Sequence, residues 1–255
     1  WSESRGLGDV YKRQYQYGDD VRNIDWNVTA RYNEPHVKVF EEERELTMML
    51  VADVSGSKQF GTQAQFKNEF VTEIAATLAF SATQNNDKIG LILFSNEVEL
   101  FIPPKKGRSH VLRIIRELLE FKPKNRETDI SEALRFLSSV LKKKAIVFVL
   151  SDFLSDDYKQ NLKIMAGKHD VTGIRVFDKS EVEIPKLGVV QMIDQETGKS
   201  HLVNTNLKRV RNNYAKYQKD RIHYYEDSFK KSGAGFLSCG TNESYPQRNG
   251  LHVSQ

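Results

Sequence analysis

The sequence predicts an α/β protein with a doubly wound, mostly parallel sheet flanked by helices. Short apolar runs such as residues 46–54 and 145–150 end in polar loops, as buried parallel strands do. Segments with apolar residues at helical spacing separate these runs, and this alternation is typical of a parallel sheet covered by helices. Ligands in such sheets bind outside the carboxyl ends of the strands, so the loops that follow the apolar runs are the first place to search for a site.

The individual elements follow from periodicity and from turn residues. The expected strands are 37–40, 46–54, 88–94, 98–102, 145–150, 170–176 and 235–238, with a hairpin formed by 189–193 and 201–203. The expected helices are 65–84, 110–119, 130–141, 158–168 and 206–231. Pro103 and Pro104 are expected to end the strand that precedes them. Thr128 or Asp129 can cap the helix at 130, and Asp129 is the favoured cap because it is adjacent to the helix.

Composition excludes several classes of protein. The 255 residues carry a net charge of only +4, with Lys and Arg interleaved among Asp and Glu, so nucleic acid is not an expected partner. Cys239 is the single cysteine, which excludes an internal disulfide. No apolar run approaches the ~20 residues of a membrane-spanning helix. We therefore expect a cytoplasmic location without a membrane segment, with membrane association through partners as the alternative.

The candidate site begins near the end of the run 46–54, at Asp53. Asp53, Ser55 and Ser57 alternate, so in an extended or looping backbone their side chains can converge on one side. One carboxylate and two hydroxyls form a hard-oxygen site, which suits Mg²⁺ or Mn²⁺ better than zinc or copper.

This Asp-x-Ser-x-Ser pattern resembles the metal-ion-dependent adhesion site of von Willebrand factor A domains. That site also takes a Thr and an Asp from two later loops, and Thr128 and Asp152 stand in the expected order. The resemblance implies direct ligation by Ser55, Ser57 and Thr128, with Asp53 and Asp152 acting mainly through bound water. An acidic residue of a partner protein would complete the ion's coordination.

A longer pattern narrows the resemblance to one bacterial family. Residues 15–31 read YQYGDDVRNIDWNVTAR, residues 37–44 read VKVFEEER, and the Asp53 loop follows. Over residues 15 to about 240 the chain is similar to the von Willebrand A-like family catalogued as domain of unknown function number fifty-eight. This resemblance implies an adaptor or co-chaperone that works with a MoxR-type AAA+ ATPase, and in some relatives a link to aerotolerance and envelope stress.

Two other functions compete with this one. A hydrolase could use Asp53 or Ser55, but the motifs that normally accompany such nucleophiles are absent, so we do not expect an enzyme. A metal-free structural scaffold would use the same hydroxyls to cap helices.

Four segments are expected along the chain. Residues 1–14 resemble translated adaptor sequence and are expected to be non-native, which leaves the true N-terminus undefined. Residues 15–45 form a family-specific segment expected to pack on the main domain, in which Asp25 and Trp26 serve either as a carboxylate or docking site or as an ion-paired scaffold. Residues 46–180 form the main domain, and residues 181–255 add the hairpin, a long helix and a last strand.

Overall fold

The computed structural model describes residues 10–40, 45–55, 62–125, 127–155, 157–178, 184–193 and 200–241. The chain divides into two units, residues 1–45 and 46–255. In the described part, no helix is both long and apolar enough to cross a membrane.

The first unit is a small hairpin with two short helices. Strand β1 (Val10–Gln14) pairs antiparallel with β2 (His36–Phe40), and η1 (Val21–Asn23) and α1 (Trp26–Tyr32) lie between them in sequence. Asp25 caps α1 by accepting hydrogen bonds from the amides of Asn27 and Val28. The same carboxylate lies 2.8 Å from Lys12 Nζ, and this ammonium holds the pKa of Asp25 below its usual range. These contacts belong to an ion-paired cap, as the scaffold interpretation of this segment expects.

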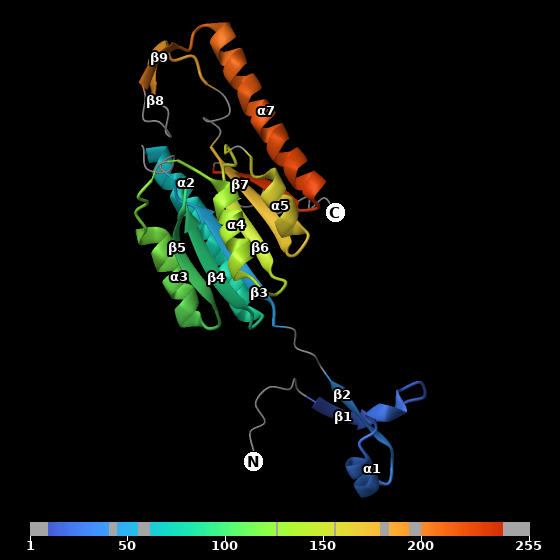
Figure 1. Ribbon diagram of the computed structural model, residues 1–255. Helices are drawn as coiled ribbons and strands as arrows, with labels where there is room; N and C mark the ends of the chain where they lie inside the picture. The colour runs from blue at the N-terminus through green and yellow to red at the C-terminus, as the bar shows by residue number, and fades with distance from the viewer. Residues whose placement is uncertain are drawn as a thin grey trace. The chain divides into compact units, whose positions relative to one another are not determined.

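The second unit contains a six-stranded sheet in the order β10-β7-β6-β3-β4-β5 (Figure 1). Every neighbouring pair is parallel except β4 and β5. The strands are β3 (Thr47–Asp53), β4 (Lys88–Phe94), β5 (Val98–Lys105), β6 (Ile146–Ser151), β7 (Asp170–Phe177) and β10 (Gly235–Gly240). The predicted α/β class with a mostly parallel sheet is therefore confirmed, and β3 lies near its centre.

Helices cover both faces of this sheet (Figure 1). They are α2 (Thr62–Gln84), α3 (Arg108–Glu120), α4 (Ile130–Val140), α5 (Lys159–Ala166) and α7 (Lys208–Ser232). Alternate residues of β3 point to opposite faces, so Met49 and Val51 join one core with α4, α5 and α7, while Leu50 and Ala52 join another with α2 and α3. Burial from Met48 to Asp53 explains why this strand reads as a continuous apolar run.

Two details differ from the sequence-based prediction. Strand β5 does not end at residue 102 but continues through Pro103 and Pro104 to Lys105. This is possible because β5 is an edge strand, where a missing N–H need not break a ladder of hydrogen bonds. The register of β5 against β4 also shifts in this region, between Ile89 and Leu91 of β4. Helix α2 begins at Thr62, three residues before the expected start at residue 65.

The C-terminal extension consists of the hairpin β8 (Val189–Ile193) and β9 (Ser200–Asn204), helix α7 and strand β10. The hairpin lies beside the amino-terminal end of α7 (Figure 1), where Arg211 donates a 2.6 Å hydrogen bond to the carbonyl of Thr205. Near the other end of α7, the Tyr225 hydroxyl contacts the carbonyl oxygens of Gly173 and Leu237 at 2.9 Å each. This residue therefore anchors α7 across β7 and β10.

Candidate metal centre

Asp53 lies at the carboxyl end of β3 and is fully buried. Its Oδ1 accepts a 2.9 Å hydrogen bond from the amide of Ser55, two residues on. Its Oδ2 accepts a 2.8 Å hydrogen bond from Ser151 Oγ at the end of neighbouring strand β6. The carboxylate is therefore held on both sides by the protein, which suits a role in orienting ligands or water around an ion.

Asp152 directly follows β6 and is also buried. Its Oδ1 accepts a 3.2 Å hydrogen bond from the amide of Leu154. Its Oδ2 lies 3.2 Å from the Nζ of Lys67, which comes from α2 and is itself buried. Helix α2 and strands β3 and β6 thus converge at the loops that follow the two strands, with a lysine beside the carboxylates.

The backbone after Asp152 is conformationally unusual. Phe153 has φ of 56°, in the left-handed region that few residues other than glycine adopt. Its ring stacks on Tyr225 with a centroid separation of 4.5 Å. It also makes a T-shaped contact with the ring of Phe229, with a centroid separation of 5.3 Å. Packing against α7 therefore fixes the turn that positions Asp152.

The second loop of the site in chain order precedes α4 and lies in sequence between the loops after β3 and β6. Asp129 is the N-cap of this helix, because its Oδ1 accepts a 3.0 Å hydrogen bond from the amide of Glu132. The amide of Asp129 donates to the carbonyl of Ser95, which follows β4, so the loop is attached to the carboxyl edge of the sheet. The prediction that Asp129 is the cap is confirmed. In the described part of the chain no group hydrogen-bonds to the Thr128 hydroxyl.

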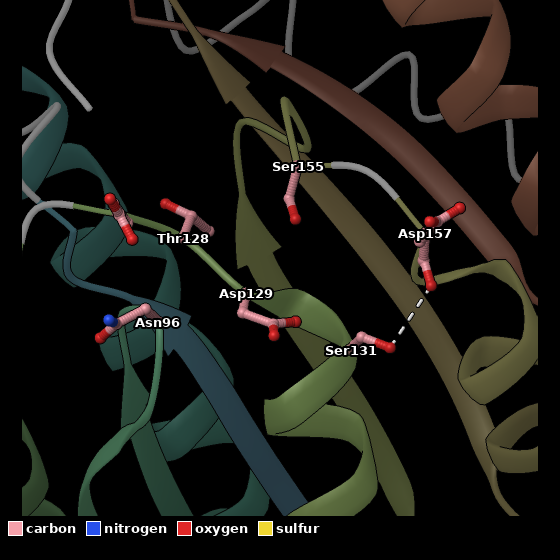
Figure 2. Close-up of a pocket in the computed structure, with 7 residues that line it drawn as sticks. Asn96, Thr128, Asp129, Ser131, Ser155 and Asp157 are labelled. Atoms are coloured by element: carbon pink, nitrogen blue, oxygen red, sulfur yellow. Dashed lines mark hydrogen bonds between the residues drawn. The ribbon is translucent and has the colours of Figure 1, made fainter. Parts of the chain in front are cut away.

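An open pocket of about 530 Å³ lies at the loop before α4 and the segments that follow β4 and β6 (Figure 2). It is lined by Asn96, Glu127, Thr128, Asp129, Ser131, Ser155 and Asp157. Ser131 Oγ donates a 3.4 Å hydrogen bond to the carbonyl of Asp157, which joins the start of α4 to the loop after β6. The rim of the pocket is acidic, and Thr128 is the one predicted ligand among its lining residues.

The structure brings most of the predicted site to the carboxyl ends of the parallel strands. The Ser151–Asp53 hydrogen bond joins the first and third loops. The amide of Val54 donates to the carbonyl of Phe94, one residue before Ser95, so the first and second loops attach to the same end of β4. Ser55 is buried beside Asp53, and Ser57 lies outside the described residues.

Sequence reasoning missed two residues that organise this site. Ser151 precedes Asp152 at a strand end and resembles an ordinary buried serine. Lys67 had a detectable signal, because it lies four and eight residues before the buried Val71 and Ala75 on one face of α2. A lysine on an apolar helical stripe needs a partner, and a fold is required to show that the partner is Asp152.

The donor set suits a hard divalent cation. Hydroxyls of Ser55 and Thr128 and carboxylates of Asp53 and Asp152 are ligands of the Mg²⁺ or Mn²⁺ type. Among the described residues, no group of three or more His, Cys, Asp and Glu side chains is placed to hold a metal. The resemblance implies a ligand set that includes hydroxyl oxygens, and Ser55 and Thr128 are the described residues that would supply them.

Comparisons with known proteins find bacterial relatives that are described as uncharacterized. Over 189 residues the chain is 32% identical to the uncharacterized protein Rv1480 of Mycobacterium tuberculosis, covering 73% of this chain and 60% of that protein. It is 29% identical over 106 residues to the uncharacterized protein YeaD of Bacillus subtilis, covering 42% of this chain and 24% of that protein. The chain thus matches less than two thirds of the length of these relatives.

Among solved structures, the hypothetical protein BatB of Bacteroides thetaiotaomicron aligns with a TM-score of 0.47 and 16% identity, over 74% of this chain and 98% of that one. A mussel byssus protein, proximal thread matrix protein 1 with a zinc-occupied MIDAS motif, aligns with a TM-score of 0.40 and 19% identity, over 52% of this chain and 38% of that one. The family model described as "Protein of unknown function DUF58" matches residues 11–224. Because this match covers most of its length, the chain belongs to the DUF58 family.

Proposed function

We propose that this chain is a protein-binding module that uses a divalent cation, Mg²⁺ or Mn²⁺, at the carboxyl edge of its sheet. The observation that carries the proposal is the Thr128 loop. Asp129 takes over the capping of α4, and the neighbouring Thr128 hydroxyl lines the pocket without a hydrogen bond to a described residue. A hydroxyl in that position can serve as a metal ligand.

The charges around the pocket support a binding mode in which a partner contributes a carboxylate. Glu127, Asp129 and Asp157 line the pocket, so an acidic side chain that approached it alone would be repelled. A divalent cation between the two proteins would reverse the sign of that interaction. Partner binding is therefore expected to require the ion rather than merely to be strengthened by it.

Catalysis is not part of the proposal. Asp53 is fully buried with both carboxylate oxygens hydrogen-bonded, and Ser55 is nearly inaccessible. A nucleophile must reach its substrate, so these contacts argue against either residue as a nucleophile. The family resemblance suggests a MoxR-type AAA+ ATPase as the partner, and the chain would then act as its adaptor or co-chaperone.

The proposal is tested by thermal melts in EDTA and in titrations of Mg²⁺ and Mn²⁺. A ligand that binds only the folded state adds ~2.7 kcal/mol at a hundred times its Kd. Asp53→Asn retains hydrogen-bonding groups for Ser55 and Ser151 but removes the charge, so it should fold and lose the metal response. Asp170→Ala removes an exposed carboxylate at the opposite, amino end of β7 and should respond like the unmodified chain.

Partner binding is tested separately by pull-down of a MoxR-type ATPase in Mg²⁺ and in EDTA. Capture that needs Mg²⁺ and fails with Asp53→Asn supports the proposal. A melting temperature that does not respond to either metal would contradict it. Such a result would favour the metal-free scaffold, the second candidate function, for which the Lys67–Asp152 pair is the supporting observation.

A further inference from the structure

Lys67 is the one residue of the site whose chemistry the proposed function does not use. Its Nζ lies 3.2 Å from Asp152 Oδ2, and both side chains are buried, with 2% and 9% of their surface exposed. The two residues are 85 positions apart in the sequence and come from α2 and from the end of β6. The pair is therefore built by the tertiary fold rather than by local chain geometry.

Stability alone gives a poor account of this pair. Removing two charges from water is costly, and replacing a buried ion pair with apolar groups of similar size is often neutral or stabilising. Position 67 also lies on a helical face that is otherwise apolar, with Val71 and Ala75 on the following turns. An apolar residue would suit this face without a partner, so the ammonium group calls for a role connected with Asp152.

We infer that Lys67 is an internal cation of the site and that its ammonium group and a divalent cation compete for the negative charge of Asp152. Asp53 and Asp152 bring two negative charges to the carboxyl edge, and Lys67 cancels one of them. A divalent ion close to Asp152 would be repelled by the ammonium group of Lys67. The ion and the ammonium group would also have to share the single negative charge of Asp152. Lys67 thus lowers the affinity of the site for metal and lets the loops keep their arrangement without it.

This inference rests on the proposed metal site, and it predicts that Lys67 variants depend on metal more than the unmodified chain does. Lys67→Met keeps the length and apolar stem of the side chain but removes the ammonium group that lies 3.2 Å from the buried Asp152 carboxylate. In EDTA its melting temperature should fall below that of the unmodified chain. Mg²⁺ or Mn²⁺ should restore it, and the apparent Kd should be lower by about tenfold or more, since a unit charge a few ångströms from the ion has been removed.

Two further variants separate charge from packing. Lys159→Met breaks an ion pair of the same 3.2 Å length, between Lys159 on α5 and Asp227 on α7, and should leave the metal response unchanged. Lys67→Met/Asp152→Asn removes both charges of the site pair. Its melting temperature in EDTA should recover toward that of the unmodified chain, and it should lack the tightened metal response.

The outcomes distinguish the inference from the proposed function. Tighter binding and metal-dependent recovery of Lys67→Met support competition for Asp152. If the unmodified chain responds to metal and Lys67→Met responds equally or less, or stays unfolded at every metal concentration, the inference is overturned and the metal site stands. If neither protein responds to Mg²⁺ or Mn²⁺, both the inference and the proposed function fail.

Discussion

Ser151 Oγ donates a 2.8 Å hydrogen bond to Asp53 Oδ2, and this bond ties the end of β6 to the end of β3. Ser151 Oγ also accepts a 3.1 Å hydrogen bond from the amide of Phe153. One buried hydroxyl therefore orients the first carboxylate of the site and the turn that carries the second.

Replacing Ser151 with Ala should destabilise the fold by about 1–3 kcal/mol, because a buried carboxylate oxygen and a buried amide each lose a partner. Urea denaturation measures this as a lower midpoint with an unchanged slope. Ser139→Ala is the matched control, since Ser139 is exposed on α4, and it should cost less than about 0.5 kcal/mol. Equal midpoints for the two variants would show that the Ser151 hydroxyl has no organising role.

Thr128 and Asp129 are adjacent, but their substitutions should affect different properties: stability for Asp129 and the metal response for Thr128. Asp129→Ala removes the N-cap of α4 and should cost about 0.5–2 kcal/mol of unfolding free energy. Thr128→Ala removes a hydroxyl that bonds to no described residue, so stability in EDTA should be nearly unchanged. The proposed metal response should instead be weakened in Thr128→Ala.

Melts in EDTA and in saturating Mg²⁺ measure both quantities on the same samples. If Thr128→Ala lowered the melting temperature in EDTA as much as Asp129→Ala does, Thr128 would be a structural residue. If its response to Mg²⁺ matched that of the unmodified chain, Thr128 would not be a ligand.

His169 makes stability dependent on pH. It is buried ahead of β7, and neither ring nitrogen has a hydrogen-bond partner in the described part of the chain. Burial, with a smaller contribution from the charge of Lys168, lowers the pKa of His169 below its ordinary value of 6.5. As the pH falls below 6.5 the unfolded chain takes up this proton before the folded chain does, so folding becomes less favourable.

His169→Leu should therefore lose less stability than the unmodified chain when the pH is lowered from about 7 to about 5. Urea midpoints across this range provide the measurement. His201→Gln, which changes an exposed histidine on β9, should keep the original profile. Parallel pH profiles for the unmodified chain and His169→Leu would argue against this role for His169.

The sheet was predictable because its signals are local. Residues 46–54 and 145–150 are apolar on both faces, and only strands buried between two helical layers require that pattern. The same locality placed Asp53 and Asp152 correctly, since each comes directly after its strand. Asp129 was predictable as a cap because capping depends on the residue next to the helix.

What the sequence could not provide was pairing between distant segments. The contacts of Lys67 with Asp152 and of Ser151 with Asp53 join residues 85 and 98 positions apart. Their charges and hydroxyls are visible in the sequence, but their partners depend on how strands and helices stack. The end of β5 was misplaced for a related reason: proline stops a central strand, and whether a strand is central or at an edge is decided by sheet order.

The prolines of β5 also limit how another protein can join this sheet. Strand β5 lies at the edge of the sheet, and Pro103 and Pro104, which have no N–H to donate, lie where its register against β4 shifts. A foreign strand could not form a continuous ladder there, and addition of a strand from a partner or from a second copy is blocked along this part of the edge. A protein that recognises this side of the molecule must therefore read side chains and loops rather than extend the backbone hydrogen bonding of the sheet.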